Sequence, residues 1–329
     1  GAGDIGRITF VSDKEHASGE IYTRDFAGSS PARRTSNTDP DYLPKWSPDG
    51  TRIAFSRFTG GVTDVYVMDP DGTDVVNLTQ GAGSSNNVLD WSPDGTRILF
   101  TSDRGPHTDL WTMNADGSNA VQLTDDAAVE GSGSWSPDGT TIVLSSFSGT
   151  SDIWLMDANG ANPRNLTQDP AEDGFPAWSP DGTRIAYSSG PFPYPQSWVM
   201  NADGTGAGVR ASAPGTGNWS PAWAPDGSKI AFTSDRDGDS DIWMMNPDGS
   251  GLAHLTSDPG NERAVSWESV NRPPVAVDDQ ATVTNCGSVI LDLLSNDSDP
   301  DGEPLMLVDV IGPMAGSVGT DAAGNSIYI

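Results

Sequence analysis

The sequence predicts an all-β fold: a six-bladed β-propeller followed by a small, incomplete β-sandwich module. Three observations predict the propeller. A tryptophan-containing unit recurs about every 44 residues, each unit holds several short β-rich runs, and tight-turn sequences separate these runs. Abundant Gly (38) and Pro (25), with only 35% apolar residues, favour short strands joined by turns. A period of this length with four strands per unit is typical of propeller blades.

The repeat is most easily followed through its tryptophans, five of which open "WSPDG" or "WAPDG" and the last a degenerate "WESVN". They are Trp46, Trp91, Trp135, Trp178, Trp223 and Trp267. After each of the first five comes a run such as "RIAFS", then a second such as "DIWMM", and in most units a third that ends in "LT". With the run that ends at tryptophan, each unit predicts four strands.

The turn sequences agree with this prediction. "SPDG" places Pro, Asp and Gly where a tight turn between the first and second strands needs them, and "NADG" or "NPDG" does so between the third and fourth. We therefore interpret the aspartates of the first turn as structural residues that bond local backbone. They are Asp49, Asp94, Asp138, Asp181 and Asp226.

The two ends of the repeat region complement each other. Residues 7–36 supply the second to fourth strands of a blade, and "RAVSW", which ends at Trp267, supplies a first strand without successors. Joining them in one blade gives six blades and leaves no open sheet edge. We therefore expect the strand of Trp267 to lie beside the segment around Ile8.

From about residue 5 to residue 268 the combination of "WSPDGTRIAF", "DIWMMNPDG" and "LT" resembles the repeat of TolB-type propellers. The resemblance implies a six-bladed propeller that usually acts as a non-catalytic binding platform in the periplasm or outside the cell. TolB itself also carries an N-terminal α/β domain, for which we expect no room here, so its Tol–Pal partnership is not carried over. The fifth unit departs from the pattern, because Ser197-Trp198 follows a loop of Pro and aromatic residues.

Charge and composition limit the partners. The formal net charge is −29, so nucleic acid and anionic membrane surfaces are repelled, and cations or basic surfaces are attracted. The same charge also suits a protein that only needs to stay soluble. Cys286 is the only cysteine, and no stretch approaches the ~20 apolar residues of a membrane span. We expect a secreted, cell-surface or periplasmic protein without membrane insertion.

The longer loops of a propeller lie on the face opposite the short turns, and variable loops on a repeating scaffold are where binding sites are usually built. On this long-loop face carboxylates accompany aromatic residues, a mixture that suits a glycan or a basic peptide. A solvated acidic rim with aromatics packed under the loops is the alternative. The candidate ligand-binding residues are Tyr42, Phe58, Phe175, Phe192, Tyr194 and Trp219.

Three functions fit these features. The first is a non-catalytic binding or scaffold protein whose long-loop face binds a glycan or protein ligand. The second is a polysaccharide lyase or glycoside hydrolase acting on the same face, although only three histidines are present and no catalytic motif is recognisable. The third is a structural segment of an adhesin or extracellular fibre. We expect no catalytic residues, and the first function is preferred.

The loop "SDRDGDSDIW" is a candidate calcium site because its aspartates alternate, as oxygen ligands do in calcium loops. They are Asp235, Asp237, Asp239 and Asp241. Gly238 is at loop position four rather than six, and Asn246 stands where such loops have an acidic ligand. Asp241 also begins a strand, as Asp64 does in another unit, so we expect it to be a blade residue first.

The repeat stops after residue 270, which divides the chain into a propeller of residues 1–270 and a module of residues 271–329. The second segment resembles cadherin-like and immunoglobulin-like modules of bacterial surface proteins, with "AVDD" followed by "SNDSDPDGEPL". Its acidic turn offers a second candidate calcium site, at Asp297, Asp299, Asp301 and Glu303. About 57 residues are few for a sandwich of ~100. Either the chain continues beyond Ile329, which we prefer, or strand-mediated self-association completes the module.

If either acidic loop holds calcium, the ion stabilises the folded chain, because it binds only where the ligands are assembled. We therefore expect the melting temperature to rise on adding calcium and to fall on adding a chelator. Thermal unfolding followed by circular dichroism checks this. An unchanged melting curve would remove calcium from both loops.

Overall fold

The computed structural model describes residues 6–15, 19–25, 30–80, 83–211 and 215–268, together with three short strands nearer the C-terminus. The chain divides into two compact units, Gly1–Val270 and Asn271–Ile329. The described residues contain strands and turns but no helix, and thus no helix that could span a membrane. The prediction of an all-β fold is confirmed.

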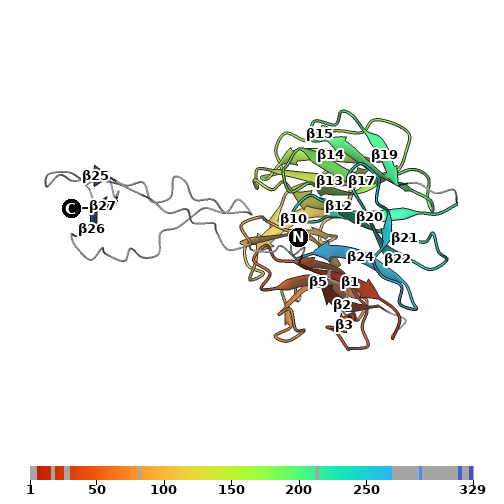
Figure 1. Cartoon of the computed structure of the whole chain (residues 1–329), viewed down its shortest axis with the longest axis horizontal. Helices are drawn as coiled ribbons and strands as arrows, with labels where there is room; N and C mark the ends of the chain where they lie inside the picture. Colours follow the sequence, from red (N-terminus) through yellow and green to blue (C-terminus); the bar gives the residue numbers. More distant parts are fainter. Residues whose placement is uncertain are drawn as a thin grey trace. The chain divides into compact units, whose positions relative to one another are not determined.

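Six four-stranded antiparallel sheets make up the first unit, and each is a blade (Figure 1). Five blades are continuous in the chain. The first two are β4 (Asp41–Trp46), β5 (Ile53–Thr59), β6 (Val62–Met68) and β7 (Val76–Asn77), then β8 (Asn86–Trp91), β9 (Arg97–Ser102), β10 (Asp109–Asn114) and β11 (Val121–Gln122). The next is β12 (Val129–Trp135), β13 (Thr141–Phe147), β14 (Ser151–Asp157) and β15 (Arg164–Asn165).

The remaining continuous blades are β16 (Asp173–Trp178), β17 (Arg184–Ser189), β18 (Gln196–Asn201) and β19 (Gly208–Ala211), then β20 (Asn218–Trp223), β21 (Ile230–Ser234), β22 (Asp241–Met245) and β23 (Ala253–His254). The sixth blade joins β24 (Glu262–Trp267) to β1 (Arg7–Ser12), β2 (Glu20–Asp25) and β3 (Ala32–Arg33). In the second unit, β25 (Val289–Ile290), β26 (Val318–Thr320) and β27 (Ser326–Tyr328) form one sheet.

The sixth blade closes the ring as the sequence predicts. β24 pairs antiparallel with β1 (Figure 1), and in this pairing Ile8 lies opposite Trp267. Beyond the strand ends, the guanidinium of Arg7 donates from Nε to Oε2 of Glu268 at 2.8 Å, and the backbone N–H of Glu268 donates to the carbonyl of Arg7 at 2.8 Å. Segments about 260 residues apart in sequence are thus held together by backbone pairing and by a charge-assisted bond.

A polar motif in five of the six blades explains why the third strand so often has an acidic residue at or near its start. In the blade of β4 to β7, Asn77 and Thr79 donate to the carboxylate of Asp64 at 2.9 and 2.8 Å. The hydroxyl of Thr79 also accepts the backbone N–H of Val65 at 2.9 Å. Because the fourth strand has only two residues, these side-chain bonds hold it where the backbone ladder is shortest.

The apolar core lies between neighbouring blades. One cluster joins Val65 and Val67 of β6 to Val88 and Trp91 of β8, and similar clusters join other neighbouring blades. Arginines reinforce some of these joints, since Arg97 lies 4.5 Å from the ring of Trp135 in the next blade. The repeated "WSPDG" tryptophan thus packs against the blade before it.

Glycines of the outer turns set how closely the blades approach. At Gly160 a Cβ would lie 2.4 Å from the carbonyl oxygen of Leu123 in the preceding blade. Gly139, in a "SPDG" turn, also has a positive φ, but there the nearest atom to a Cβ would be 3.9 Å away. The first glycine is needed for the turn and for blade contact, the second only for the turn.

The inner strands are bulged, a feature the sequence did not predict. The pairing of first and second strands shifts register in all six blades, for example between Tyr42 and Lys45. At four of these shifts a residue other than glycine has a positive φ: Leu43, Phe175, Ser220 and Ala264. Such backbone is costly and is often found at functional sites.

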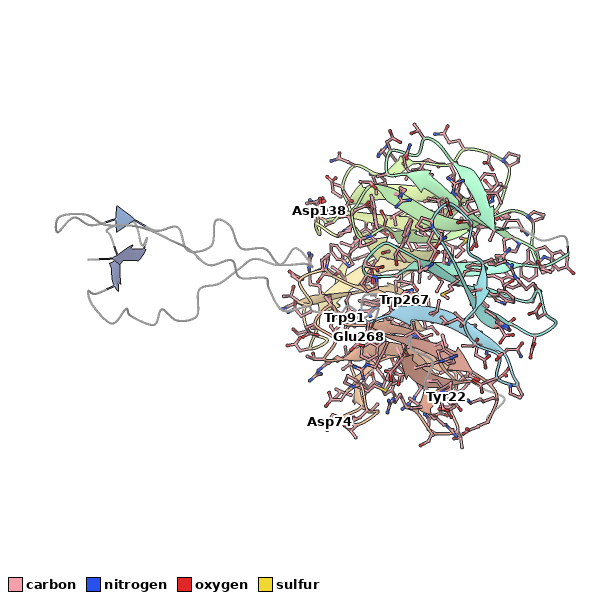
Figure 2. The ribbon with its side chains drawn as sticks, viewed as in Figure 1. Tyr22, Asp74, Trp91, Asp138, Trp267 and Glu268 are labelled. Atoms are coloured by element: carbon pink, nitrogen blue, oxygen red, sulfur yellow. The ribbon has the colours of Figure 1, made fainter. Side chains whose placement is uncertain are left out.

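The aspartates of the "SPDG" turns bond their own turns, so their structural interpretation is confirmed. Asp49 accepts from the hydroxyl of Ser47 at 2.6 Å and from the backbone N–H of Thr51 at 3.0 Å. Asp94, Asp138, Asp181 and Asp226 likewise accept the backbone N–H two residues ahead. Asp138 and the outer-turn residue Asp74 lie on the same side of the propeller (Figure 2), which is the short-turn face.

Alanine substitution should separate the two roles of glycine. We expect Gly139→Ala to lower the free energy of unfolding by about 1 kcal/mol, the cost of a side chain at positive φ. Gly160→Ala should cost about 1–3 kcal/mol more, because its methyl group would overlap backbone of the preceding blade. Urea unfolding of the two variants checks this, and equal losses would contradict the contact between blades.

Candidate functional site

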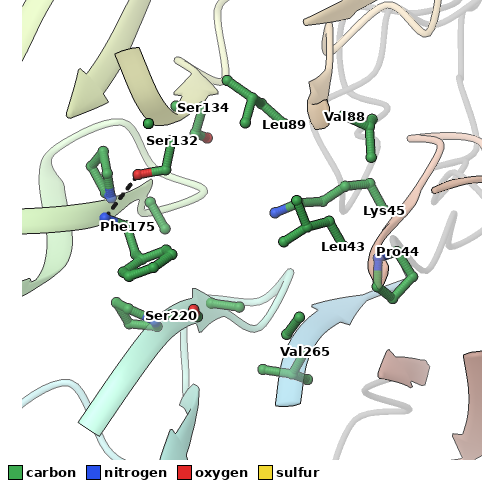
Figure 3. Close-up of a pocket in the computed structure, with 17 residues that line it drawn as sticks. Leu43, Pro44, Lys45, Val88, Leu89, Ser132, Ser134, Phe175, Ser220 and Val265 are labelled. Carbon is green, nitrogen blue, oxygen red and sulfur yellow. Dashed lines mark hydrogen bonds between the residues drawn. The ribbon is translucent and has the colours of Figure 1, made fainter. Parts of the chain in front are cut away.

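A cavity at the centre of the ring is lined by all six inner strands (Figure 3). Its volume is about 140 Å³, and its walls are mostly apolar, with Leu43, Val88 and Phe175 among them. The four bulge residues with positive φ all line it, so the bulges shape its wall. The backbone N–H of Phe175 donates to the hydroxyl of Ser132 at 2.9 Å across two blades (Figure 3).

Lys45 is the one charged residue among those that line the cavity, and its ammonium points into it (Figure 3). Burial lowers the pKa of Lys45, and the carboxylate of Asp90 in the next blade opposes that shift. Asp90 itself accepts the backbone N–H of Trp135 at 2.9 Å. Lys45 directly precedes the repeat tryptophan, and it is the only one of the six residues at this place in the repeat that is positively charged. An alignment of the six repeats could therefore have identified it as a candidate.

At the long-loop end of the blades, the first residue of the inner strand, or in β12 the second, is polar and buried. In three blades an arginine bonds it and covers aromatic rings of the same blade. Arg57 donates to both carboxylate oxygens of Asp41, at 2.6 and 2.9 Å. Arg104 donates to Asn86 at 2.9 Å, and Arg236 to Asn218 at 2.6 Å. We call the buried polar residue, together with the space beside it that the arginine fills, the arginine seat.

Three blades lack this arginine, and two of them, which are neighbours, have no lysine in its place. In these two blades the buried polar residue that an arginine would bond is Glu130 in β12 and Asp173 in β16. Burial, with help from Asp126 and Asp109, raises the pKa of Glu130 to about 7, although the Ser146 hydroxyl opposes the shift. Burial also raises the pKa of Asp173. Oε2 of Glu130 has no hydrogen-bond partner.

In the sixth blade Lys14 lies over the ring of Tyr22, at 4.7 Å, but the buried Glu262 is bonded by the hydroxyl of Ser12 at 2.7 Å instead. Burial raises the pKa of Glu262 to about 8, and the carboxyl of Asp241 adds to the shift. Lysine therefore shares the stacking but does not reach the buried carboxyl.

The aspartates of the loop 235–241 face other groups of the protein or solvent rather than a common centre. Asp235 accepts the backbone N–H of Gly217 at 2.7 Å, and Asp241 is bonded by Nε2 of His254 at 2.9 Å. Asp237 lies 3.8 Å from Nδ1 of His254, and Asp239 is exposed. Within the described ranges no three His, Cys, Asp or Glu residues are grouped as a metal would need. Asp241 is a blade residue, as expected.

The second candidate calcium site, Asp297, Asp299, Asp301 and Glu303, lies outside the described residues. His16 lies outside them too. His107 is exposed, whereas His254 stacks on Trp243 with ring centroids 4.3 Å apart.

The predicted ligand-binding aromatic residues differ in how much of each side chain is exposed to solvent. Tyr42 is half-buried, and its hydroxyl is 2.5 Å from that of Thr63. Trp219 is half-buried, with its ring against Gly217, where a Cβ would overlap it. The others are exposed: Phe58, Phe175, Phe192 and Tyr194.

Most exposed aromatics lie on the two neighbouring blades that have neither arginine nor lysine at this position. Phe192 is 87% exposed, and Tyr194 and Phe175 belong to the same blade. On the blade of β12 to β15, Val129 and Phe147 lie opposite each other in the strand pairing and are also exposed. We call these five residues the aromatic sector. Val129 and Glu130 were not among the predicted binding residues, because their roles depend on a missing arginine.

Comparison with known proteins identifies both parts of the chain. Residues 2–148 and 127–217 match the family model described as TolB beta propeller domain, and residues 271–329 match that described as Bacterial Ig domain. The predicted TolB-type propeller followed by an immunoglobulin-like segment is confirmed. The Tol-Pal system protein TolB of Desulfosudis oleivorans is 38% identical over 61 residues, 18% of this chain and 14% of that protein's length.

Solved structures share the propeller fold. TolB from Acinetobacter baumannii superposes with a TM-score of 0.72 at 22% identity, over 80% of this chain and 67% of that one. An oligogalacturonate lyase in complex with manganese superposes with a TM-score of 0.53 at 20% identity, over 77% of this chain and 73% of that one. At such identities the likeness shows the fold alone.

Glu130→Gln tests the raised pKa. Because folding raises the pKa of Glu130 to about 7, the folded chain binds a proton more tightly than the unfolded chain. Its contribution to stability is therefore present at pH 4 and lost as the pH rises to about 7. We expect Glu130→Gln to leave stability nearly unchanged at pH 4 and to raise it by about 2 kcal/mol at pH 8. Urea unfolding at both pH values checks this, and parallel pH profiles would contradict it.

Proposed function

Because the chain belongs to the TolB β-propeller domain family, we propose that it is a non-catalytic binding protein whose long-loop face holds a protein ligand or a glycan. The aromatic sector carries this proposal. Exposed aromatic rings next to carboxylates are a common binding surface, since the rings supply contact area at a low cost in conformational entropy. The binding site would lie outside the cell or in the periplasm.

The rigidity of the ring supports the proposal. Val129, Phe147 and Phe175 of the aromatic sector lie in strands of two adjacent blades, and the loop that carries Phe192 and Tyr194 is held between β17 and β18. Preorganised side chains lose little freedom on binding, and more of the contact energy remains as affinity. Calcium at the two acidic loops, and self-association through residues 271–329, remain further parts of the proposal.

A polysaccharide lyase or hydrolase is the second candidate, and one observation favours it. The pKa of Glu130, raised to about 7, would suit a general acid or base at neutral pH. Against it, among the described residues no histidine group or metal-ligand cluster accompanies Glu130. We therefore prefer binding without turnover.

Removing the most exposed aromatics tests the binding proposal. Glycan arrays and a displayed peptide library would first select a ligand for the whole chain. We expect the double variant Phe192→Ala/Tyr194→Ala to weaken that ligand at least tenfold, because these rings are exposed in the aromatic sector. Titration calorimetry measures the affinity.

The matched control is Val76→Ala/Leu252→Ala, which removes two exposed apolar side chains from short strands and turns elsewhere in the propeller. Its affinity should equal that of the unchanged chain. Equal affinity of both double variants would place the binding site elsewhere, and release of unsaturated sugars from polygalacturonate would favour the lyase.

A further inference from the structure

The arginine seat is a repeated design, and its chemistry is clearest where the buried residue is a carboxylate. In the blade of β4 to β7, Arg57 and Asp41 face each other in the strand pairing and form two parallel hydrogen bonds. The same guanidinium lies 4.9 Å from the ring centroid of Tyr66. The buried carboxylate is thus neutralised by a planar cation that also covers an aromatic ring.

In the blade of β12 to β15 the same position has a carboxylate but no cation. Glu130 pairs with Ser146 where Asp41 pairs with Arg57. Glu130 is 3% exposed, and one of its oxygens has no partner, while the other accepts from the Ser146 hydroxyl at 3.3 Å. Trp154, which corresponds to Tyr66, has no cation over its ring within the described part of the chain.

A second unpartnered oxygen lies near the first. Asp109 at the start of β10 in the preceding blade is buried, and its Oδ1 has no partner, whereas Oδ2 accepts from Gln122 at 2.8 Å. The charge of Asp109 contributes to the raised pKa of Glu130, so the two carboxyls are close enough to interact. Leaving buried acceptors unpaired costs free energy that a donor would recover.

The surface around this seat is accessible and apolar. Val129 and Phe147, the residues next to Glu130 and Ser146, are 44% and 48% exposed. At Gly149, in the turn that follows, a Cβ would meet no atom within 4 Å, so the turn is not packed against its surroundings. A side chain from outside can therefore approach by displacing Phe147 and the turn.

We propose that the blade of β12 to β15 receives its missing arginine from a protein ligand, whose guanidinium bonds Glu130 while apolar neighbours of that arginine pack on Val129 and Phe147. This inference rests on the proposed function and deepens it, because it names the ligand as a polypeptide with an arginine beside apolar residues. The net charge of −29 favours such a cationic segment over an acidic one.

Arginine fits this seat better than the alternatives. Three blades of the same protein place arginine there, and the one lysine at this position, Lys14, does not reach the buried Glu262. A divalent cation would need more ligands than the described residues group together. Asp173 also has unpartnered carboxylate oxygens, but the residues beside it are Glu172 and Gly190 rather than an exposed apolar pair such as Val129 and Phe147.

The first experiment uses the peptide acetyl-Leu-Arg-Leu-amide and its citrulline analogue at pH 8, where Glu130 is ionised. Citrulline has nearly the same shape as arginine but no charge. We expect the arginine peptide to bind at least tenfold more tightly, with shifts of the Val129 and Phe147 amide signals in NMR titrations. Glu130→Gln should lose this preference. Asp169→Asn removes one charge from an exposed loop of the neighbouring blade and should keep it.

The second experiment fills the seat from within. Ser146→Arg places an arginine opposite Glu130 in the register that Arg57 has opposite Asp41. We expect this variant to melt at a higher temperature and to bind the arginine peptide at least tenfold more weakly. Ser146→Gln, which is polar but shorter and uncharged, should do neither.

The inference is overturned if the citrulline peptide binds equally well, or if Glu130→Gln and Ser146→Arg leave peptide binding unchanged. Its failure is distinguishable from failure of the proposed function. A ligand that depends on Phe192 and Tyr194 but is indifferent to Glu130 would keep the binding function and remove the arginine seat from it.

Discussion

The pairing of β24 with β1 is the constraint on which the other features of the propeller depend. A sheet edge left open at this point would expose unpaired backbone and free the first and last blades from each other. The bonds between Arg7 and Glu268 extend the pairing beyond the strand ends. Closure fixes the circumference, so the six inner strands enclose one cavity and the long loops of all blades face the same side.

Within this closed ring most blades repeat the same polar side-chain contacts, so a blade that lacks one of them can be recognised by comparison with the others. Asp241 and Asp64 have the same role near the start of a third strand, where each is bonded by a threonine that follows the fourth strand. One carboxylate of the acidic loop that ends at Asp241 is therefore part of the blade structure. The arginine seat works by the same logic. Because an arginine bonds the buried residue in three blades, its absence beside Glu130 is evident from comparison with Asp41, which has one.

The fold could be predicted almost entirely from sequence, because the spacing of Trp46, Trp91 and their counterparts sets the blade length and the complementary ends set the closure. The site was harder to predict. Exposed Phe192 and Tyr194 were recognised from a Pro-rich loop, whereas half-buried Trp219 is covered because Gly217 leaves room for its ring. Lys45 and the inner-strand bulges escaped prediction, since φ angles and cavity walls depend on how six blades meet.

The raised pKa of Glu130 argues for a binding role more than for a catalytic one. A buried carboxyl that is half-protonated near neutral pH needs no counterion, so the free protein can tolerate an unfilled seat without a large penalty. An arriving guanidinium favours the ionised form, and proton release then accompanies binding. The raised pKa therefore lets Glu130 remain without a partner in the free chain and still bind a cation. A carboxylate that stayed ionised at this depth would lower the stability of the free chain more.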